Sequence, residues 1–486
     1  MLILDAEIDA QHGSGRRVDV RLDEGDGQKR QSGQRGRIAQ LAPAGTLSPQ
    51  AGEAVYPAAG ALLLPGLHDH HLHLAALAVA LDSLPCGPPQ VKTAAALAAQ
   101  LETADSVGSA TEWLRGVGYH ESVAGEIDRH WLDRVVPQRP VRIQHRSGRL
   151  WLVNSAALQH LLAAGGSLPA GLERQGGQPT GRIFDADDWL RHRLPRRFPS
   201  LTAASRRLAG YGVTGLTDTT PHNGPEEWQQ VQAAQAAGSL WQDVLLMGDA
   251  RLDGMHGSAG VRRGALKLHL HEYELPPFEA LVAAVARSHA VDRPAAFHCV
   301  TRTELIFALG VLACAGRHPG DRIEHAAIAP PDSLPLLVEQ GVTVVTQPNF
   351  IQERGDVYLR EVAAADQPWL YRLRGLQAVG IPLAGSTDAP FGAVDPWAAM
   401  QAAVDRRTAD GAVLGAEEGL TPEQAVALFL GSAEVSVEVP AGAVRRIAVG
   451  AAADLCLLDR PWQQARSHLA AVKVVATFKD GRHLPP

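Results

Sequence analysis

The run LLLPGLHDHHLHL, over residues 62–74, contains two histidines, His71 and His73, that stand two positions apart after an apolar stretch. Residues i and i+2 of an extended chain point to the same side, so both imidazoles can face one metal ion. The alternative is a histidine-rich surface turn. We assign that alternative to His68 and His70, which lie on the other phase of the same run.

A second run, GALKLHLHE over residues 264–272, places Lys267 in a strict alternation of leucines with polar residues, which predicts a strand. A lysine on a buried strand is costly unless it has a partner. A buried ion pair is one explanation. The other is a metal site in which the amine is carboxylated, because a carbamate is an anionic oxygen ligand that can bridge two cations and offset their repulsion.

Three more candidate ligands stand at the ends of apolar runs: His298 in PAAFHCV, His325 in DRIEHAAI and Asp388 in IPLAGSTDAPFGAVDPW. Taken singly, each histidine is more often a core residue with its hydrogen bonds satisfied, and the aspartate is more often a turn or helix cap. The carboxyl ends of the strands of a barrel meet on one face. We therefore predict that these three residues converge there with the first three candidates.

The elements that would position these residues follow a regular order, in which short apolar runs alternate with helical stretches rich in Ala and Leu. This order predicts βαβ units and a (β/α)8 TIM barrel of the α/β class. The eight expected strands cover residues 61–67, 211–217, 242–247, 264–270, 294–299, 321–325, 342–346 and 381–386.

Three regions follow from this pattern. Both chain ends, 1–60 and 435–486, show β-type patterning, and we expect them to form one small β-sandwich. The barrel would occupy residues 61–434. Residues 75–205 interrupt it after the first strand, and because such insertions emerge on the active-site face, we expect a subdomain that caps the substrate.

Composition excludes several functional classes. The formal charge of −7, from 45 basic and 52 acidic residues, is unlike that of a general nucleic-acid binder. The N-terminus has no basic signal-peptide region, and no apolar stretch near the motifs is long enough to span a membrane. Four cysteines without a C-x-x-C spacing indicate reduced thiols, so we expect a cytoplasmic protein.

The order of these ligands, H-x-H after strand 1, Lys after strand 4, His after strands 5 and 6 and Asp after strand 8, resembles that of the amidohydrolase superfamily. Further runs are similar to the subgroup that contains N-substituted formamide deformylases, and the similarity covers essentially the whole chain. These runs are GYHE (118–121), VNSAAL (153–158), PTGRI (179–183), GVTGLTDT (212–219), RIEHA (322–326), TQPNF (346–350), STDAP (386–390) and VDRRTADGAVLG (404–415).

The resemblance implies a hydrolase that acts on carbon–nitrogen bonds other than peptide bonds. It would cleave an amide, N-formyl or N-acyl bond with a metal-activated hydroxide, and Asp388 would serve as general base and then as general acid. We expect one metal on His71, His73, Lys267 and Asp388. A second would be held by Lys267, as the CO2-derived carbamate, with His298 and His325. Zinc suits this set, and Mn2+ or Fe2+ also fits it.

Substrate contacts are expected in or near the insertion, where Arg149 could hold a substrate carboxylate in a forked pair or form an ordinary surface salt bridge. The chain departs from the subgroup pattern in this region and beside the ligands. Ser147, Gly148 and Arg149 replace an Asp-Gly-His run, His271 replaces an aspartate, and residues 299–303 replace a Gly-Asp pair. The full set of expected substrate contacts is Tyr119, His120, Gln144, Arg149 and Asn154.

Other functions stay open at this point. One alternative is a mononuclear deaminase or a single-zinc acylase in which Lys267 is an ordinary amine. A lactone or ester hydrolase, or a catalytically silent binding protein on the same fold, is another. The expected partner is a small-molecule substrate, with neither nucleic acid nor membrane, and a homodimer is left open.

Overall fold

A computed structural model describes the chain apart from residues 9–14, 25–34, 89, 108, 110–111, 195–197, 259, 432–444 and 486. The described residues form two compact units: unit 1 comprises Met1–Leu77 and Leu201–Pro486, and unit 2 comprises Ala78–Ser200. For comparison, the insertion was expected over 75–205, and the expected boundary at residue 435 lies outside the described residues. No helix in the described part of the chain has both the length and the apolar character needed to cross a membrane.

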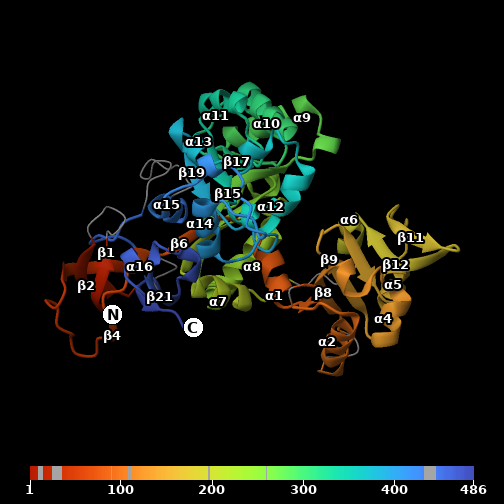
Figure 1. Cartoon of the computed structure of the whole chain (residues 1–486), viewed down its shortest axis with the longest axis horizontal. Coiled ribbons are helices and arrows are strands. Elements are labelled where there is room, and N and C mark those ends of the chain that lie inside the picture. The colour runs from red at the N-terminus through yellow and green to blue at the C-terminus, as the bar shows by residue number, and fades with distance from the viewer. Residues whose placement is uncertain are drawn as a thin grey trace. The chain divides into compact units, whose positions relative to one another are not determined.

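The centre of unit 1 is a parallel sheet of eight strands with helices between them, a (β/α)8 barrel as predicted (Figure 1). The first and last strands approach each other at the seam, where Asp388 N donates to His71 O at 2.9 Å. In order around the sheet the strands are β6 (Leu67–Leu72), β13 (Val213–Asp218), β14 (Asp243–Gly248), β15 (Val261–His269), β16 (Ala295–Cys299), β17 (Arg322–His325), β18 (Thr343–Thr346) and β19 (Leu383–Gly385).

Several helices of unit 1 begin with local sequence signals. The helix α10 (Arg302–Ala315) starts with a capping box in which Thr301 and Glu304 satisfy each other's backbone amides. Apolar residues of this helix pack on the outer face of strands β16 and β17 in one buried core. The other helices are α7 (Thr202–Gly210), α8 (Pro225–Ala236), α9 (Phe278–Ala290), α11 (Leu334–Gln340), α12 (Asn349–Glu361), α13 (Arg374–Ala378), α14 (Pro396–Asp405), α15 (Pro422–Leu430) and α16 (Trp462–Ala465).

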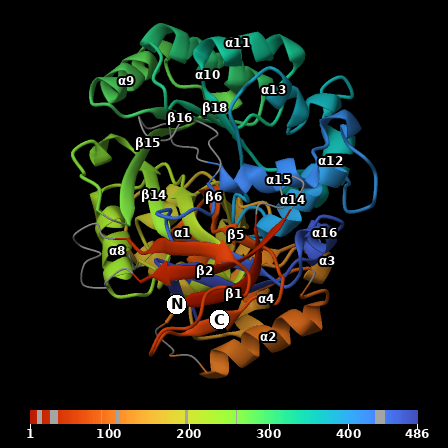
Figure 2. The ribbon, with the colours of Figure 1, turned by 90° about the vertical axis from the view of Figure 1, so that its left-hand side faces the viewer.

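Both chain ends contribute to two four-stranded sheets that share one buried apolar core (Figure 2). One sheet is built from β1 (Leu2–Ile8), β2 (Arg16–Asp23), β3 (Arg37–Pro43) and β4 (Val55–Pro57). The other combines β5 (Leu63–Pro65) with β20 (Leu455–Leu458), β21 (Val474–Lys479) and β22 (Arg482–His483).

The predicted position of the first barrel strand, 61–67, is wrong. Its apolar centre forms β5, which pairs with β20 in a terminal sheet, and the barrel strand is the histidine-rich run Leu67–Leu72 itself. Pro65 and Gly66 separate the two strands. A Cβ on Gly66 would lie 2.2 Å from Thr214 Oγ1, so the chain passes from one sheet to the other where only glycine fits.

Unit 2 is a mixed six-stranded sheet with a separate apolar core on each face. Its strands, in spatial order, are β11 (Leu172–Gln175), β12 (Gln178–Phe184), β10 (Leu150–Val153), β9 (Val141–His145), β8 (Leu114–Tyr119) and β7 (Leu84–Pro85). The helix α1 (Leu74–Leu81) runs across the boundary between the units. The helices of unit 2 are α2 (Ala94–Val107), α3 (Glu121–Ala124), α4 (Arg129–Val135), α5 (Ser155–Ala163) and α6 (Asp187–Arg191).

Candidate metal centre

His71 in strand β6 and His73, directly after the strand, both approach the carboxylate of Asp388, as the alternation predicts. The Nε2 atoms of His71 and His73 lie 3.5 Å and 3.4 Å from Asp388 Oδ1, which comes from the far end of the barrel sequence. The prediction that His68 and His70 form a surface turn is wrong. The two rings stack at 4.5 Å between centroids, and His70 is 1% exposed, because their strand β6 belongs to the barrel sheet, where it pairs with β13.

His298 and His325 bring two more imidazoles to the same place from the ends of β16 and β17. The His325 ring centroid lies 4.7 Å from that of His71 and 4.5 Å from that of His298. Lys267, on the neighbouring strand β15, is buried, and its Nζ has no hydrogen-bond partner among the described residues. Desolvation lowers the pKa of Lys267 to about 8, although the charge of Glu324 opposes this shift.

Three of the histidines have their Nδ1 atoms held by polar side chains. His71 Nδ1 lies 2.6 Å from Glu324 Oε2, and because a carboxylate only accepts, this nitrogen carries the proton. His325 Nδ1 lies 2.7 Å from Gln347 Oε1, and His73 Nδ1 lies 3.0 Å from Thr220 Oγ1. Such partners orient metal-binding imidazoles and leave their Nε2 atoms as ligands.

Glu324, which supports His71, was not among the predicted site residues. It is fully buried and accepts from Arg322 Nε at 2.7 Å and from Arg322 Nη2 at 3.1 Å. Burial alone would raise the pKa of Glu324, but the charges of Arg322 and Lys267 hold this pKa well below its usual range. Glu324 therefore stays ionised and can fix His71 from the opposite side of the barrel.

Asp388 sits in a strained turn after β19, with a positive φ of 56°. The preceding residue, Thr387, is tied to the first strand, since its backbone N and Oγ1 donate to the two carboxylate oxygens of Asp69 at 3.2 Å and 2.5 Å. Burial opposes ionisation of Asp388, but the nearby imidazoles of His73, His71 and His325 lower its pKa. The carboxylate is thus charged and fixed in place.

Helix α12 holds the same turn from outside. Its Asn349 Nδ2 donates to Thr387 O at 3.1 Å, its Glu353 Oε1 accepts from Ala393 N at 3.0 Å, and its Arg354 Nη2 donates to Phe391 O at 2.7 Å. These three hydrogen bonds fix the turn before Asp388, at Thr387, and after it, at Phe391 and Ala393. The side chains of α12 therefore position the carboxylate without touching it.

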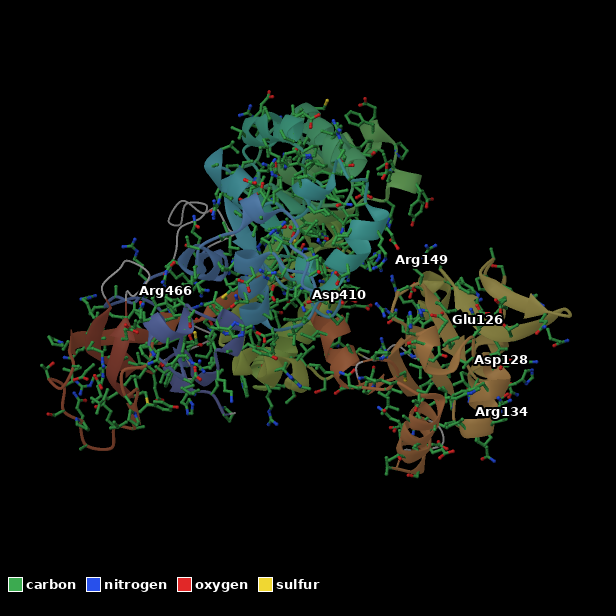
Figure 3. All side chains as sticks on the ribbon, viewed as in Figure 1. Glu126, Asp128, Arg134, Arg149, Asp410 and Arg466 are labelled. Carbon is green, nitrogen blue, oxygen red and sulfur yellow. The ribbon has the colours of Figure 1, made fainter. Side chains whose placement is uncertain are left out.

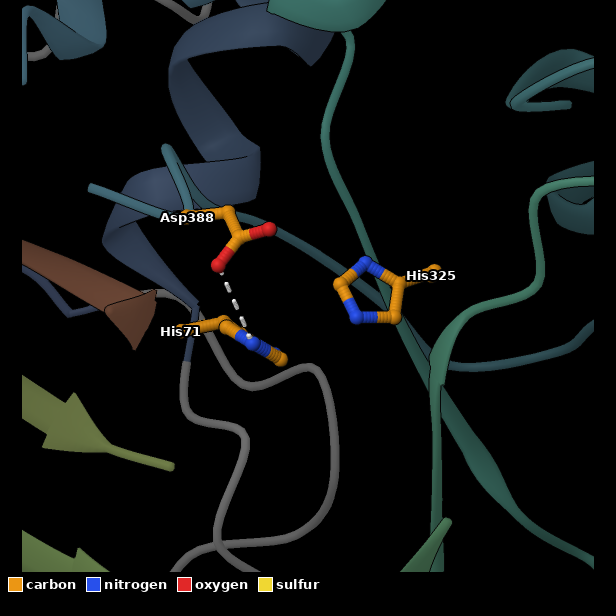
Figure 4. Close-up of side chains that lie close together, drawn as sticks. All are labelled: His71, His325 and Asp388. Carbon is orange, nitrogen blue, oxygen red and sulfur yellow. Dashed lines mark ion pairs between the residues drawn. The ribbon is translucent and has the colours of Figure 1, made fainter. Parts of the chain in front are cut away.

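The donor set fits a divalent cation. One ligand atom each from His71, His325 and Asp388 lie within 4.8 Å of one another (Figure 4). Asp388 Oδ1 is buried and makes no hydrogen bond in the described part of the chain, so a cation would satisfy it. Imidazole and carboxylate ligands are those of catalytic zinc sites.

Two of the residues expected to contact substrate are buried within unit 2. Tyr119 donates its hydroxyl to Gly125 O at 2.6 Å. Asn154 caps helix α5, since its Oδ1 accepts from Ala157 N at 2.9 Å, and its Nδ2 donates to two backbone carbonyls. These contacts give both residues a structural role, and their contact with substrate stays a prediction.

The other three expected substrate contacts are less enclosed. Arg149 lies at the surface of unit 2 and forms a forked pair with Asp185, at 2.8 Å and 2.7 Å (Figure 3). His120 caps the short helix α3 through a bond from Ser122 N, and Gln144 Nε2 donates to Gly148 O at 3.3 Å. The salt bridge that was the alternative for Arg149 is present, and binding of a substrate carboxylate by this residue stays a prediction.

Three supporting residues were missed by the sequence analysis. Glu324 and Gln347 stand in the runs RIEHA and TQPNF, and Thr220 follows strand β13. Each is a polar residue at the end of a predicted buried strand, which is the signal that identified the histidines. Their partners lie far away in the chain, however, so the sequence did not show which histidine each one supports.

Comparison with known proteins agrees with this geometry. Residues 54–484 match the model of the amidohydrolase family. An N-substituted formamide deformylase of Arthrobacter pascens is 25% identical to this chain in an alignment 492 residues long. The alignment covers 88% of this chain and 89% of the relative.

Two solved structures of uncharacterised metal-dependent hydrolases share the fold. The one from Pyrococcus horikoshii has a TM-score of 0.76 at 18% identity and covers 100% of this chain and 99% of its own. The one from Pyrococcus furiosus has a TM-score of 0.74 at 20% identity and covers 94% of this chain and 98% of its own.

Proposed function

The chain belongs to the amidohydrolase family and is a hydrolase that acts on C–N bonds, and from this premise we propose that its substrate is an N-formyl or N-acyl amine of low molecular mass. One observation carries the proposal. Imidazoles from β6, β16 and β17 and the carboxylate of Asp388 gather at one end of the barrel, and Nδ1 of His71 and of His325 is held by a protein side chain.

The family implies a divalent metal, and the gathered residues would hold it. One metal would be bound by His71, His73, Lys267 and Asp388. A second would be bound by Lys267 with His298 and His325, and Lys267 would then carry a carbamate formed from CO2 by its amine, with release of a proton. When bound, zinc or a similar ion supplies Lewis-acid polarisation of the scissile carbonyl and lowers the pKa of a water molecule.

Asp388 would transfer the proton in this reaction. It would accept the proton of the attacking water at a carboxylate oxygen and deliver it to the leaving nitrogen, so that one residue serves as base and then as acid. Its placement supports the role, because Oδ1 is buried between the Nε2 atoms of two histidines and makes no hydrogen bond in the described structure. Helix α12 would keep the carboxylate in the orientation that both transfers need.

The metal content of the purified protein tests the proposal. We expect about two metals per chain in the parent. Lys267→Ala should lose metal and should no longer turn over N-formyl and N-acyl amines. The exposed Lys473 offers a matched control, and Lys473→Ala should keep both. An unchanged metal content in Lys267→Ala would remove the bridging carbamate from the proposal.

A mononuclear centre is the second candidate. The compact group of His71, His325 and Asp388 favours it, because one ligand atom from each of these three residues lies within 4.8 Å of the others. About one metal per chain, in the parent and in Lys267→Ala alike, would establish this candidate. The substrates to test would then include those of deaminases and single-metal acylases.

A further inference from the structure

Two arginines of unit 2 stand side by side without an acidic partner. Arg115 on β8 and Arg142 on β9 are directly paired in the parallel register of these strands, so their side chains leave the same face of the sheet. No ion pair or hydrogen bond joins either guanidinium to another described residue. Both side chains are half-buried, and both Nε atoms are buried and unbonded.

Two indoles flank this arginine pair. The guanidinium carbons of Arg115 and Arg142 lie 5.8 Å and 5.7 Å from the ring centroid of Trp151, and that of Arg142 lies 5.9 Å from the ring of Trp113. Indole faces attract cations, but they carry no net charge and accept no strong hydrogen bond. The two tryptophans therefore border the arginine pair without neutralising its positive charge.

Burying two like charges next to each other is unfavourable and lowers the pKa of a guanidinium. Desolvation and the charge of Arg142 lower the pKa of Arg115 to about 10, and desolvation lowers that of Arg142. Two other arginines of the same unit form ion pairs with acidic residues. Arg149 pairs with Asp185 at 2.7 Å, and Arg182 pairs with Glu173 at 3.4 Å. The compensating charge is thus missing only for the pair on β8 and β9 among these four.

We propose that Arg115 and Arg142 form an anion-binding site, and that the ligand is a carboxylate joined to a flat apolar group. The carboxylate oxygens would accept from the two guanidiniums, which present forked donors. The apolar part would pack against Trp113 and Trp151, whose rings supply flat contact area. The residues of this site belong to unit 2 and the candidate metal ligands belong to unit 1. The proposal does not depend on the proposed hydrolysis.

Calorimetric titration of the full chain with 2-naphthoate and with its neutral amide, 2-naphthamide, tests this site. We expect naphthoate to bind at least about tenfold more tightly than naphthamide, which cannot offer a charge to the arginines. Arg115→Met and Arg142→Met should each weaken naphthoate about tenfold or more. Arg174→Met removes an exposed arginine of the same unit, which donates to Gly177 O at 2.9 Å, and should leave naphthoate affinity unchanged.

Two further measurements separate a binding site from a structural role. Without ligand, the methionine variants should unfold at the same temperature as the parent or higher, because a repulsive buried charge is gone. Asp388→Ala should bind naphthoate as the parent does, which excludes the barrel cluster as the place of binding. If a methionine variant does not fold, Arg115→Lys or Arg142→Lys replaces it. Lysine keeps the positive charge but lacks the forked donors of the guanidinium, so naphthoate binding should still weaken.

Equal binding of naphthoate and naphthamide by the parent would overturn the proposal, as would naphthoate binding that survives both substitutions. A lower unfolding temperature of both methionine variants, together with no naphthoate binding by the parent, would show that the arginines only support the fold of unit 2.

Discussion

Two regions of this molecule bury charge in opposite ways. In the barrel, cations and anions meet: Glu324 contacts Arg322 and His71, and Asp388 lies between His71 and His73. In unit 2, Arg115 and Arg142 lie together beside indoles, and no described acidic residue pairs with them. The first region pairs its charges within the protein and offers imidazole and carboxylate atoms that suit a cation. The second region offers two guanidiniums without an acidic partner among the described residues, which suits an anion. The two regions are therefore suited to ligands of opposite charge.

The largest effect should come from removing the carboxylate of the barrel region. Asp388→Ala deletes the group that would move the proton, so we expect kcat for an N-acyl or N-formyl amine to fall by roughly 10²–10⁴-fold. The circular-dichroism spectrum should not change. Near-normal kcat in this variant would contradict the proposed role of Asp388, because its carboxylate would then have only a structural role in the barrel.

A somewhat smaller effect should follow from weakening the support of His71. Glu324→Gln removes a buried negative charge that orients this imidazole, and we expect the affinity for zinc to fall by about 10- to 100-fold in a chelator competition. Glu339 is exposed on helix α11 and provides the control, because Glu339→Gln should leave zinc affinity unchanged. If the two variants bound zinc equally well, Glu324 would not support a metal ligand.

Helix α12 allows a test of positioning alone. Glu353→Ala breaks the bond to Ala393 N beside the Asp388 turn, and we expect kcat to fall roughly tenfold while KM and metal content stay the same. Glu361→Ala, at the exposed end of the same helix, should keep all three quantities. A change in metal content without a change in kcat would show that α12 acts on the ligands and not on the orientation of the carboxylate.

The smallest effect is expected at the surface of unit 2. The exposed pair of Arg149 and Asp185 should contribute less than about 1 kcal/mol to the free energy of unfolding, so Arg149→Met should scarcely change the unfolding midpoint. If Arg149 also holds a substrate carboxylate, KM should rise for carboxylate-bearing substrates only. An unchanged KM for these substrates would leave Arg149 as a salt-bridge residue and sharpen the contrast with Arg115 and Arg142.

Much of the fold was predictable because the barrel repeats a simple pattern. Most of the buried parallel strands are apolar runs, and seven of the eight expected runs overlap a barrel strand over at least half of their length, whereas the first shares only Leu67 with one. The first failed because residues 63–65 are as apolar as a barrel strand, while Leu67–Leu72 contains four polar residues. The assignment of a run to one sheet or another depends on its partner strand, and β20 lies almost four hundred residues away.

The candidate ligands were found for a related reason. Histidine, lysine and aspartate at the ends of apolar runs stand out against their surroundings, and the barrel brings such ends to one face. Their supporting residues did not stand out in the same way. His71 and Glu324 are 253 positions apart, and the polar positions of a single strand do not indicate which side chain across the barrel they meet.

The sequence by itself therefore determined the order of strands and helices and the residue types gathered at the barrel mouth, since both follow from local patterning and a fixed topology. Only the tertiary structure decided the pairs: Glu324 with His71, α12 with the Asp388 turn, and Arg115 with Arg142. The physical reason is that electrostatic and hydrogen-bond energies depend on distances of a few ångströms, and the register and closure of the sheets set those distances.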